Sequence, residues 1–161
     1  MLGRLRGESL TLDEFLNNEE KLLGKLQTAT LLSRFKEKYL AADYDPKNQR
    51  RSWLYNCNLS CEARWISTDD FGTIIMDRDK LVFFYSERDR KMFAVTFGEI
   101  FDLIADFEPW DEVDALVFDN SLDWLVVINH EDITGLHNVE TGEARTRAVT
   151  DAPFGSKREN G

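Results

Sequence analysis

The residues best suited to chemistry are His130, Glu131 and Asp132, which directly follow an apolar stretch that predicts a strand. A metal site needs imidazole and carboxylate ligands that converge on one ion at about 2 Å. The spacing is not that of a His-Glu-x-x-His helix, and neighbouring residues on a strand point to opposite faces. The cluster therefore leaves two interpretations: a metal-dependent hydrolase, or a strand-end histidine that hydrogen-bonds the following turn.

Two further pairs of residues could bind an ion or act as catalytic groups. Asp119 and Asp123 flank a predicted turn, and paired carboxylates can hold a divalent cation, but tight turns also favour Asp, Asn and Ser. Cys57 and Cys61 form Cys-x3-Cys without a second pair or a nearby histidine, which makes a poor zinc site. We therefore expect turn carboxylates and reduced thiols, with no catalytic residue and no cofactor.

Acidic side chains are concentrated in one segment of the chain. The 161 residues include 20 Lys and Arg against 30 Asp and Glu, for a net charge of −10. Residues 101–140, which we call the acidic segment, contain eleven Asp and Glu and no Lys or Arg. Phosphate groups need Lys and Arg opposite them, so nucleic acid and anionic membrane surfaces are disfavoured as partners.

Two interpretations of the acidic segment remain open. It could pair internally with the basic first third of the chain and aid solubility, or it could form a face for a basic protein partner. Trp110 lies among carboxylates after a proline, where it could anchor such a partner or close the end of the core. The candidate partner-binding residues are Asp106, Glu108, Trp110, Asp111, Glu112, Asp119 and Asp123.

Helices are predicted in three places. Thr11 with Glu14 and Thr96 with Glu99 each form a capping box, in which a hydroxyl and a carboxylate satisfy each other's backbone donors. Apolar spacing then predicts helices over residues 12–26, 28–40 and 97–107, the last ending before Pro109. Residues 43–51 are polar and predict a loop.

Strands are predicted between and after these helices. The expected strands are residues 53–55, 63–66, 71–76, 81–85, 92–95, 113–118, 122–129 and 133–139. Residues 71–76 and 81–85 should form a hairpin, residues 124–128 a central strand covered on both faces, and residues 133–139 a weak outer strand. The fold class is therefore α+β, with N-terminal helices and a mainly antiparallel sheet, a meander plus a C-terminal hairpin, with a helix inserted between the two strand groups.

Length and composition predict one soluble domain. Hydrophobic residues make up 42% and charged residues 31% of the chain, and no stretch reaches the roughly 18 apolar residues of a membrane span. The basic N-terminus has no apolar segment behind it, so we expect no signal peptide. We expect a single domain over residues 1–151, a flexible tail over residues 152–161 and a cytoplasmic location.

Two segments resemble known bacterial proteins. Residues 81–104, LVFFYSERDRKMFAVTFGEIFDLI, resemble the strand, charged turn, strand and Ser/Thr-Phe-x-Glu helix of the SUKH (SMI/KNR-like) immunity proteins. Residues 121–131, SLDWLVVINHE, are similar to an Asp-Trp-apolar-Asn-His segment of small uncharacterised bacterial proteins. The resemblance implies a toxin-neutralising or other protein-binding role and supplies no catalytic residues.

The sequence thus predicts a non-enzymatic, acidic protein-binding module. The expected role is an immunity or inhibitor protein that neutralises a basic protein partner, such as a toxin. A metal-dependent hydrolase using His130, Glu131 and Asp132 and a regulatory oligomeric subunit are the alternatives.

Overall fold

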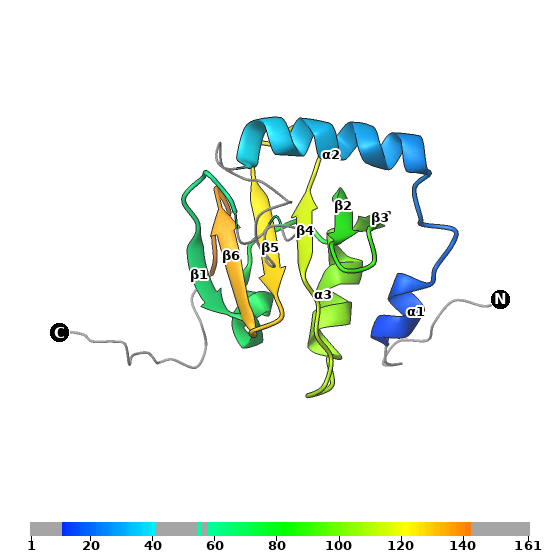
Figure 1. The fold of residues 1–161 in the computed structure, drawn as a ribbon. Helices are drawn as coiled ribbons and strands as arrows, with labels where there is room; N and C mark the ends of the chain where they lie inside the picture. The colour runs from blue at the N-terminus through cyan, green and yellow to red at the C-terminus, as the bar shows by residue number, and fades with distance from the viewer. Residues whose placement is uncertain (1–10, 41–54, 56–57, 143–161) are drawn as a thin grey trace.

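A six-stranded antiparallel sheet with helices on both faces forms the centre of the molecule (Figure 1). The computed structural model describes residues 11–40, 55 and 58–142. The helical segments are α1 (Leu12–Leu16), α2 (Lys25–Tyr39), the 3-10 helix η3 (Thr68–Thr73) and α3 (Phe97–Ala105). The strands are β1 (Arg64–Ser67), β2 (Leu81–Ser86), β3 (Lys91–Thr96), β4 (Ala115–Phe118), β5 (Leu125–Asn129) and β6 (Ile133–His137), in the order β1-β6-β5-β4-β2-β3. The predicted α+β fold is confirmed, with α3 between the two strand groups.

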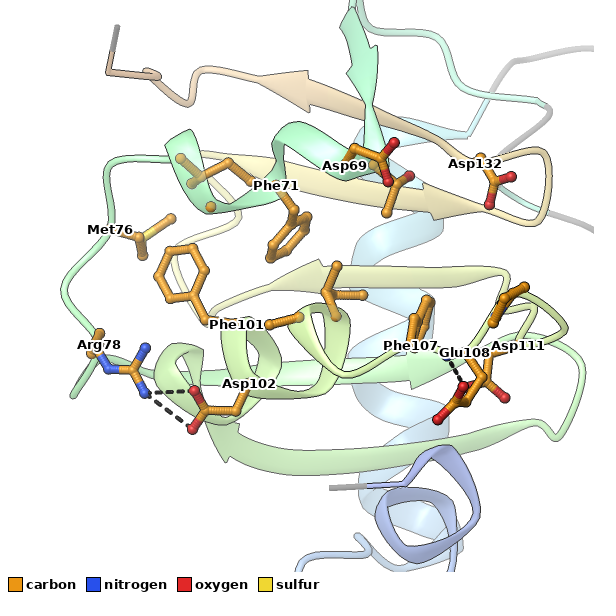
Figure 2. Close-up of a pocket in the computed structure, with 16 residues that line it drawn as sticks. Asp69, Phe71, Met76, Arg78, Phe101, Asp102, Phe107, Glu108, Asp111 and Asp132 are labelled. Carbon is orange, nitrogen blue, oxygen red and sulfur yellow. Dashed lines mark hydrogen bonds and ion pairs between the residues drawn. The ribbon is translucent and has the colours of Figure 1, made fainter. Parts of the chain in front are cut away.

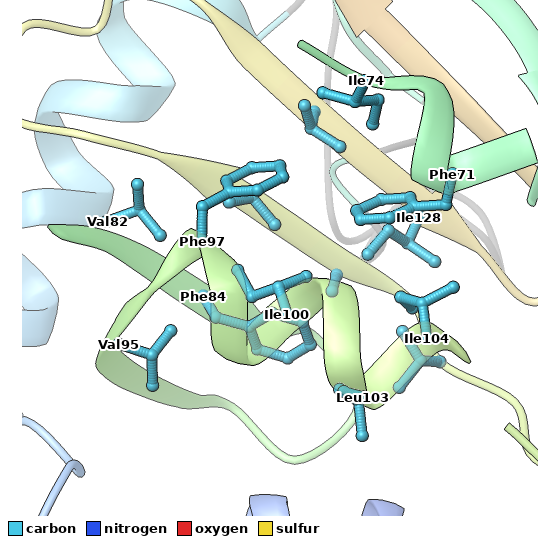
Figure 3. Packing of buried hydrophobic residues seen from close by; sticks show 14 of the residues in the cluster. Phe71, Ile74, Val82, Phe84, Val95, Phe97, Ile100, Leu103, Ile104 and Ile128 are labelled. Carbon is cyan, nitrogen blue, oxygen red and sulfur yellow. The ribbon is translucent and has the colours of Figure 1, made fainter. Parts of the chain in front are cut away.

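The first core lies between the sheet and α3, with α1 and η3 beside it. On α3, Phe97, Ile100 and Leu103 are fully buried, at the three-residue spacing that places side chains on one helix face (Figure 3). They pack against alternate residues of the strands, such as Val82 and Phe84 of β2. This core supports the site described below.

The second core lies on the opposite face of the sheet, under α2. Leu31, Phe35 and Tyr39, spaced four residues apart, form the buried face of α2. The hydroxyl of Tyr39 donates a hydrogen bond to the carbonyl of Leu122, and burial, with smaller contributions from nearby acidic groups, raises the pKa of Tyr39 to about 12. Tyr39 is therefore a neutral core residue.

Both capping boxes are confirmed, but the first helix is shorter than predicted. The Thr11 hydroxyl accepts from the Glu14 amide at 3.1 Å, and Thr96 accepts from Glu99 at 3.2 Å. The expectation that the first helix continues to residue 26 is wrong, because α1 ends at Leu16 and residues 21–23 instead extend along the edge of β3. Backbone hydrogen bonds between residues 21–23 and β3 take the place of the helical hydrogen bonds expected there. The second predicted helix corresponds to α2.

Two strand predictions are wrong. Residues 71–76 do not pair with β2, which pairs with β3 and β4 instead. The first half of the predicted strand belongs to η3, which Ser67 caps by accepting from the Asp69 amide. Residues 133–139 are not an outer strand, because β6 lies between β1 and β5. The apolar residues at positions 71–76 predict a strand, and nothing in that pattern indicates that Ser67 caps a helical turn.

The predicted strand over residues 53–55 is also wrong at Tyr55, which lies in a 3-10 turn. The other strands agree with the prediction in place, although β4 and β5 begin two and three residues later than expected. β5 is the covered central strand, and Leu125 to Ile128 are at most 1% exposed. Four of the remaining predictions concern positions outside the described residues: residues 53–54, the loop at 43–51, Cys57 and the tail over 152–161. Within the described part of the chain, no helix has the length and apolar character needed to cross a bilayer.

Candidate functional site

An open groove of about 960 Å³ lies between η3 and α3, and we call it the η3–α3 groove (Figure 2). Its apolar lining comes mainly from Phe71, Ile74, Met76, Phe101, Ile104 and Phe107. Phe71 and Ile104 are buried at 2% and 8% exposure, whereas Phe101 and Phe107 are half-buried and reach the surface. The groove therefore presents apolar surface to solvent.

Local hydrogen bonds position the two sides of the groove. On the η3 side, the Thr68 amide donates to the Asp132 carbonyl at 2.8 Å, and the Thr68 and Thr134 hydroxyls are 2.9 Å apart in a buried contact. On the α3 side, the Thr96 capping box fixes the helix start, so that Phe97 enters the core. Both sides are thus tied to the sheet.

Three phenyl rings join the two sides beneath the groove. The Phe71 and Phe97 rings are stacked with centroids 5.9 Å apart. Phe101 meets both edge-on, at 5.7 Å from Phe71 and 4.9 Å from Phe97. Edge-on and stacked aromatic pairs add stability beyond the area that they bury. The shape of the groove therefore depends on Phe97, which lies under its floor.

Carboxylates surround this apolar floor. The lining includes five acidic residues, Asp69, Asp102, Glu108, Asp111 and Asp132, and one cation, Arg78. Arg78 donates to both oxygens of Asp102, at 3.0 and 3.1 Å, and its guanidinium lies 5.8 Å from the centre of the Phe101 ring. The lining therefore has a formal charge of −4, with its one cation at one end (Figure 2).

The structure places five of the predicted partner-binding residues on one loop beside the groove. Glu108 and Asp111 line it, and the Glu108 amide donates to the Asp111 carboxylate at 2.8 Å. Trp110 is 75% exposed in the same turn, so it does not close the core. Asp106 caps the end of α3, and Glu112 lies 3.6 Å from Arg88.

The other two predicted residues lie at the opposite end of β4. Asp119 directly follows this strand, and at about 3.3 Å per residue the four residues of β4 separate Asp119 from the 106–112 loop by roughly 13 Å. Asp123 is 3.9 Å from Lys38 of α2. The sheet therefore divides the acidic segment between two ends of the molecule.

Among the described residues, cations from earlier in the chain pair with five acids of the acidic segment. The pairs are Arg78–Asp102, Arg88–Glu112, Arg88–Asp114, Lys80–Asp119 and Lys38–Asp123. Lys38 alone among these cations belongs to the first third of the chain. Internal pairing thus accounts for part of the acidic segment, while the groove keeps its excess of negative charge.

His130 and Arg88, both partly exposed, contact the buried carboxylate of Asp114. The His130 backbone amide and Nδ1 lie 3.1 and 2.9 Å from Oδ1 of Asp114, whose side chain is fully buried, and Arg88 Nε donates to the other oxygen at 2.7 Å. Glu131 and Asp132 are exposed beyond His130. Among the described residues, no three His, Cys, Asp or Glu side chains converge as metal ligands would.

Asp119 stabilises its turn as a charged group. Burial would raise the pKa of Asp119, but hydrogen bonds from Ser121, Trp124 and Lys80 together outweigh it and hold the pKa below the ordinary value of 3.8. The Ser121 hydroxyl and Trp124 Nε1 donate at 2.6 and 3.0 Å, and Lys80 Nζ is 3.3 Å away. The sequence-based interpretation of Asp119 as a turn residue agrees with this geometry.

We expect Asp119→Asn to lower the free energy of unfolding by about 1–2 kcal/mol at neutral pH, because the donors lose a charged acceptor. Since the folded pKa lies below the unfolded one, this contribution is present above pH 3.8 and is lost as the pH falls through the folded pKa. Urea unfolding of both proteins between pH 7 and pH 3 measures it. A difference that grows on acidification would contradict this assignment.

Comparisons with known proteins add no relative, because no family model, curated protein or solved structure matches the chain. The resemblance of residues 81–104 to SUKH immunity proteins stays a prediction. Sequence reasoning missed Asp69 and Asp132 as part of the site. Their signal in the sequence is weak, since they belong to two short acidic pairs, Asp69-Asp70 and Glu131-Asp132, in different parts of the chain, and Asp132 drew attention only as a possible metal ligand.

Proposed function

We propose that this protein is a non-enzymatic binding module that holds a basic segment of a partner protein in the η3–α3 groove. The observation that supports this most directly is the lining, in which five carboxylates and one arginine surround the half-buried rings of Phe101 and Phe107. An apolar side chain of the partner would cover the rings, and its Lys or Arg residues would meet the carboxylates. Such a pairing of an apolar centre with charged surroundings is typical of protein interfaces.

The charge of the groove favours a basic protein over other classes of partner. A nucleic acid would bring phosphates against a lining of charge −4. Trp110, exposed beside Glu108 and Asp111, extends the same surface with a residue type enriched in binding hot spots. Opposite charges also accelerate association by about 10–1000-fold, an effect that salt weakens.

An inhibitor of a basic toxin is the particular role that we propose. Proteins that act on nucleic acids need basic surfaces opposite the phosphates, and an acidic protein can cover such a surface. The resemblance of residues 81–104 to bacterial immunity proteins supports the same role. Asp106, Glu108, Trp110, Asp111 and Glu112 would contribute to the contact, with Asp119 and Asp123 on a separate surface.

We call the end of the groove opposite Arg78, with Glu108, Asp111 and Asp132, the open end. Neutralising these three carboxylates should weaken binding of a basic segment at least tenfold. The variant is Glu108→Gln, Asp111→Asn and Asp132→Asn; Asn suits position 132, where φ is 66°, because Asn tolerates this left-handed conformation. Peptides selected from a random displayed library on the unmodified protein provide the probe. Their affinities for both proteins are measured by calorimetry at two salt concentrations.

The matched control removes the same charge elsewhere. Glu19→Gln, Glu20→Gln and Glu37→Gln also changes the net charge from −10 to −7, at exposed positions away from the groove. This control should bind the peptides within about threefold of the unmodified protein, since distant exposed charges are screened. Selected peptides without basic residues, or equal losses in the two triple variants, would overturn the proposal.

A further inference from the structure

We infer that the open end of the η3–α3 groove binds an arginine of the partner, next to an apolar side chain held over the centre of the groove. The inference rests on the proposed function and specifies its ligand. The arginine would lie against Phe107, between the carboxylates of Glu108, Asp111 and Asp132.

The protein's own Arg78 provides an internal example of this contact. At its end of the groove, the guanidinium lies over the half-buried Phe101 ring and donates to both oxygens of Asp102. It also donates to the Gly98 carbonyl at 3.3 Å. A phenyl ring and a carboxylate, together with a backbone carbonyl, thus hold a guanidinium on this surface, by a cation–π contact and by hydrogen bonds from Nη2 to both oxygens of Asp102.

The opposite end of the groove has the same two components without a cation in its lining. Phe107 is half-buried there, and Glu108, Asp111 and Asp132 lie around it (Figure 2). Among the residues that line the groove, Arg78 is the one Lys or Arg, and it lies at the other end. The hydrogen bond from the Glu108 amide fixes the Asp111 carboxylate within the loop. This end thus offers a second place for a guanidinium, and within the part of the chain that the structure describes no Lys or Arg lines it.

The apolar centre of the groove should also select an apolar residue near the bound arginine of the partner. Phe71 lies between the two ends, and Met76 lies towards Arg78 (Figure 2). Ile104, midway between Phe101 and Phe107 in the sequence, also lines the groove. An apolar side chain placed here would bring a nearby arginine to Phe107. An arginine on the other side of that side chain would approach Arg78, which has the same charge. The groove should therefore bind segments with arginine on one side of an apolar residue and gain little from arginine on both sides.

Three sets of short synthetic peptides test this inference. The first has one arginine two positions before or after a leucine in a neutral Gly/Ser background. The second has lysine in place of that arginine, and the third has arginine on both sides of the leucine. Affinities are measured by calorimetry, and shifts of the phenyl-ring NMR signals of Phe101 and Phe107 locate the bound peptide.

We expect the lysine peptides to bind about tenfold more weakly than the arginine peptides, because an ammonium cannot stack flat on a ring and bond two oxygens in parallel. Shifts should be largest at Phe107. Removing the charge by Arg78→Gln should strengthen binding of the two-arginine peptide by about threefold or more and change binding of the one-arginine peptides less, because their single arginine already has the Phe107 end. The Arg78–Asp102 pair is more than half exposed, at 57% and 58%, so this substitution should not unfold the protein.

The outcomes separate the inference from the proposed function. Equal affinity for lysine and arginine peptides, or largest shifts at Phe101, would overturn the arginine site while leaving a basic-segment groove in place. Absence of binding by every basic peptide, with the protein folded, would overturn both. An equal response of the one- and two-arginine peptides to Arg78→Gln would exclude the role of Arg78 in selecting between them.

Discussion

Replacing Phe97 with alanine is expected to lower the free energy of unfolding by about 3–5 kcal/mol, the largest effect among the substitutions considered. Phe97 is 0% exposed and its ring packs against Phe71, Phe101 and Trp124, with centroids 4.9–6.2 Å apart. Alanine would leave a cavity that these rings could fill only in part. Urea unfolding followed by circular dichroism measures the loss.

The same substitution should also change the η3–α3 groove. Phe97 lies under both Phe71 and Phe101, so its removal lets the groove floor sink towards the cavity. We therefore expect weaker peptide binding at concentrations of urea where the variant is still folded. Phe97→Leu keeps much of the volume and should lose less stability and less affinity.

The control for this experiment is Leu81→Ala on β2. Leu81 is 66% exposed, so its truncation should change stability by no more than about 0.5 kcal/mol. A loss below about 1 kcal/mol for Phe97→Ala would contradict the description of this ring as the support of the groove. Unchanged peptide affinity in a destabilised Phe97→Ala protein would show that the floor does not depend on it.

Features fixed by local chemistry could be predicted from the sequence. Both capping boxes and α3 follow from side chains three residues apart, and the unbroken apolar run of β5 indicated a strand buried on both faces. The turn at Asp119 is likewise local, because its carboxylate accepts from residues two and five positions later. In these places short-range hydrogen bonds decide the conformation.

Features that depend on distant partners could not be predicted. Residues 21–23 follow the edge of β3, about seventy residues later in the chain, although their apolar spacing fits a helix. The position of β6 inside the sheet depends on β1, which covers its edge. Phe71 was expected in a strand, but η3 turns its ring towards Phe97. In each case tertiary contacts override the local pattern.

The candidate site combines both kinds of information. The loop with Glu108, Trp110 and Asp111 is a contiguous acidic stretch, so its charge was evident in the sequence. The carboxylates opposite it, Asp69 and Asp132, come from η3 and from the turn before β6, and the fold alone brings them to the same groove. The antiparallel reversal of the chain explains why Asp119 and Asp123 lie elsewhere.

The second large effect is expected at Asp114, where alanine should lower the free energy of unfolding by about 2–4 kcal/mol. The Asp114 side chain is fully buried and accepts from Arg88 Nε at 2.7 Å and from the backbone amide of His130 at 3.1 Å, while His130 Nδ1 lies 2.9 Å away. Without this carboxylate, Arg88 Nε, the His130 amide and His130 Nδ1 lose their partner. Water can reach the half-exposed Arg88 and His130 side chains in part, which limits the loss.

Asp114 also positions the open end of the groove. Through His130 it holds the turn that contains Asp132, and Arg88 links it to Glu112 at the end of the 106–112 loop. Asp114→Ala should therefore weaken binding of arginine peptides, although Asp114 does not line the groove. Glu112→Gln is the matched control for stability alone, since Glu112 is itself a proposed contact residue: it removes a 3.6 Å exposed ion pair and should cost less than about 1 kcal/mol of unfolding free energy.

A double-mutant cycle separates this positioning role from a general loss of stability. If Asp114 acts through His130, the losses of Asp114→Ala and His130→Ala in unfolding free energy should be non-additive by about 1–3 kcal/mol. His130→Ala removes the Nδ1 contact but keeps the backbone amide that donates to Asp114, so peptide affinity should be non-additive if the ring contact helps to hold the turn before β6. Additive losses in both measurements would mean that Asp114 and His130 act independently, and the groove would then owe its geometry to η3 and α3 alone.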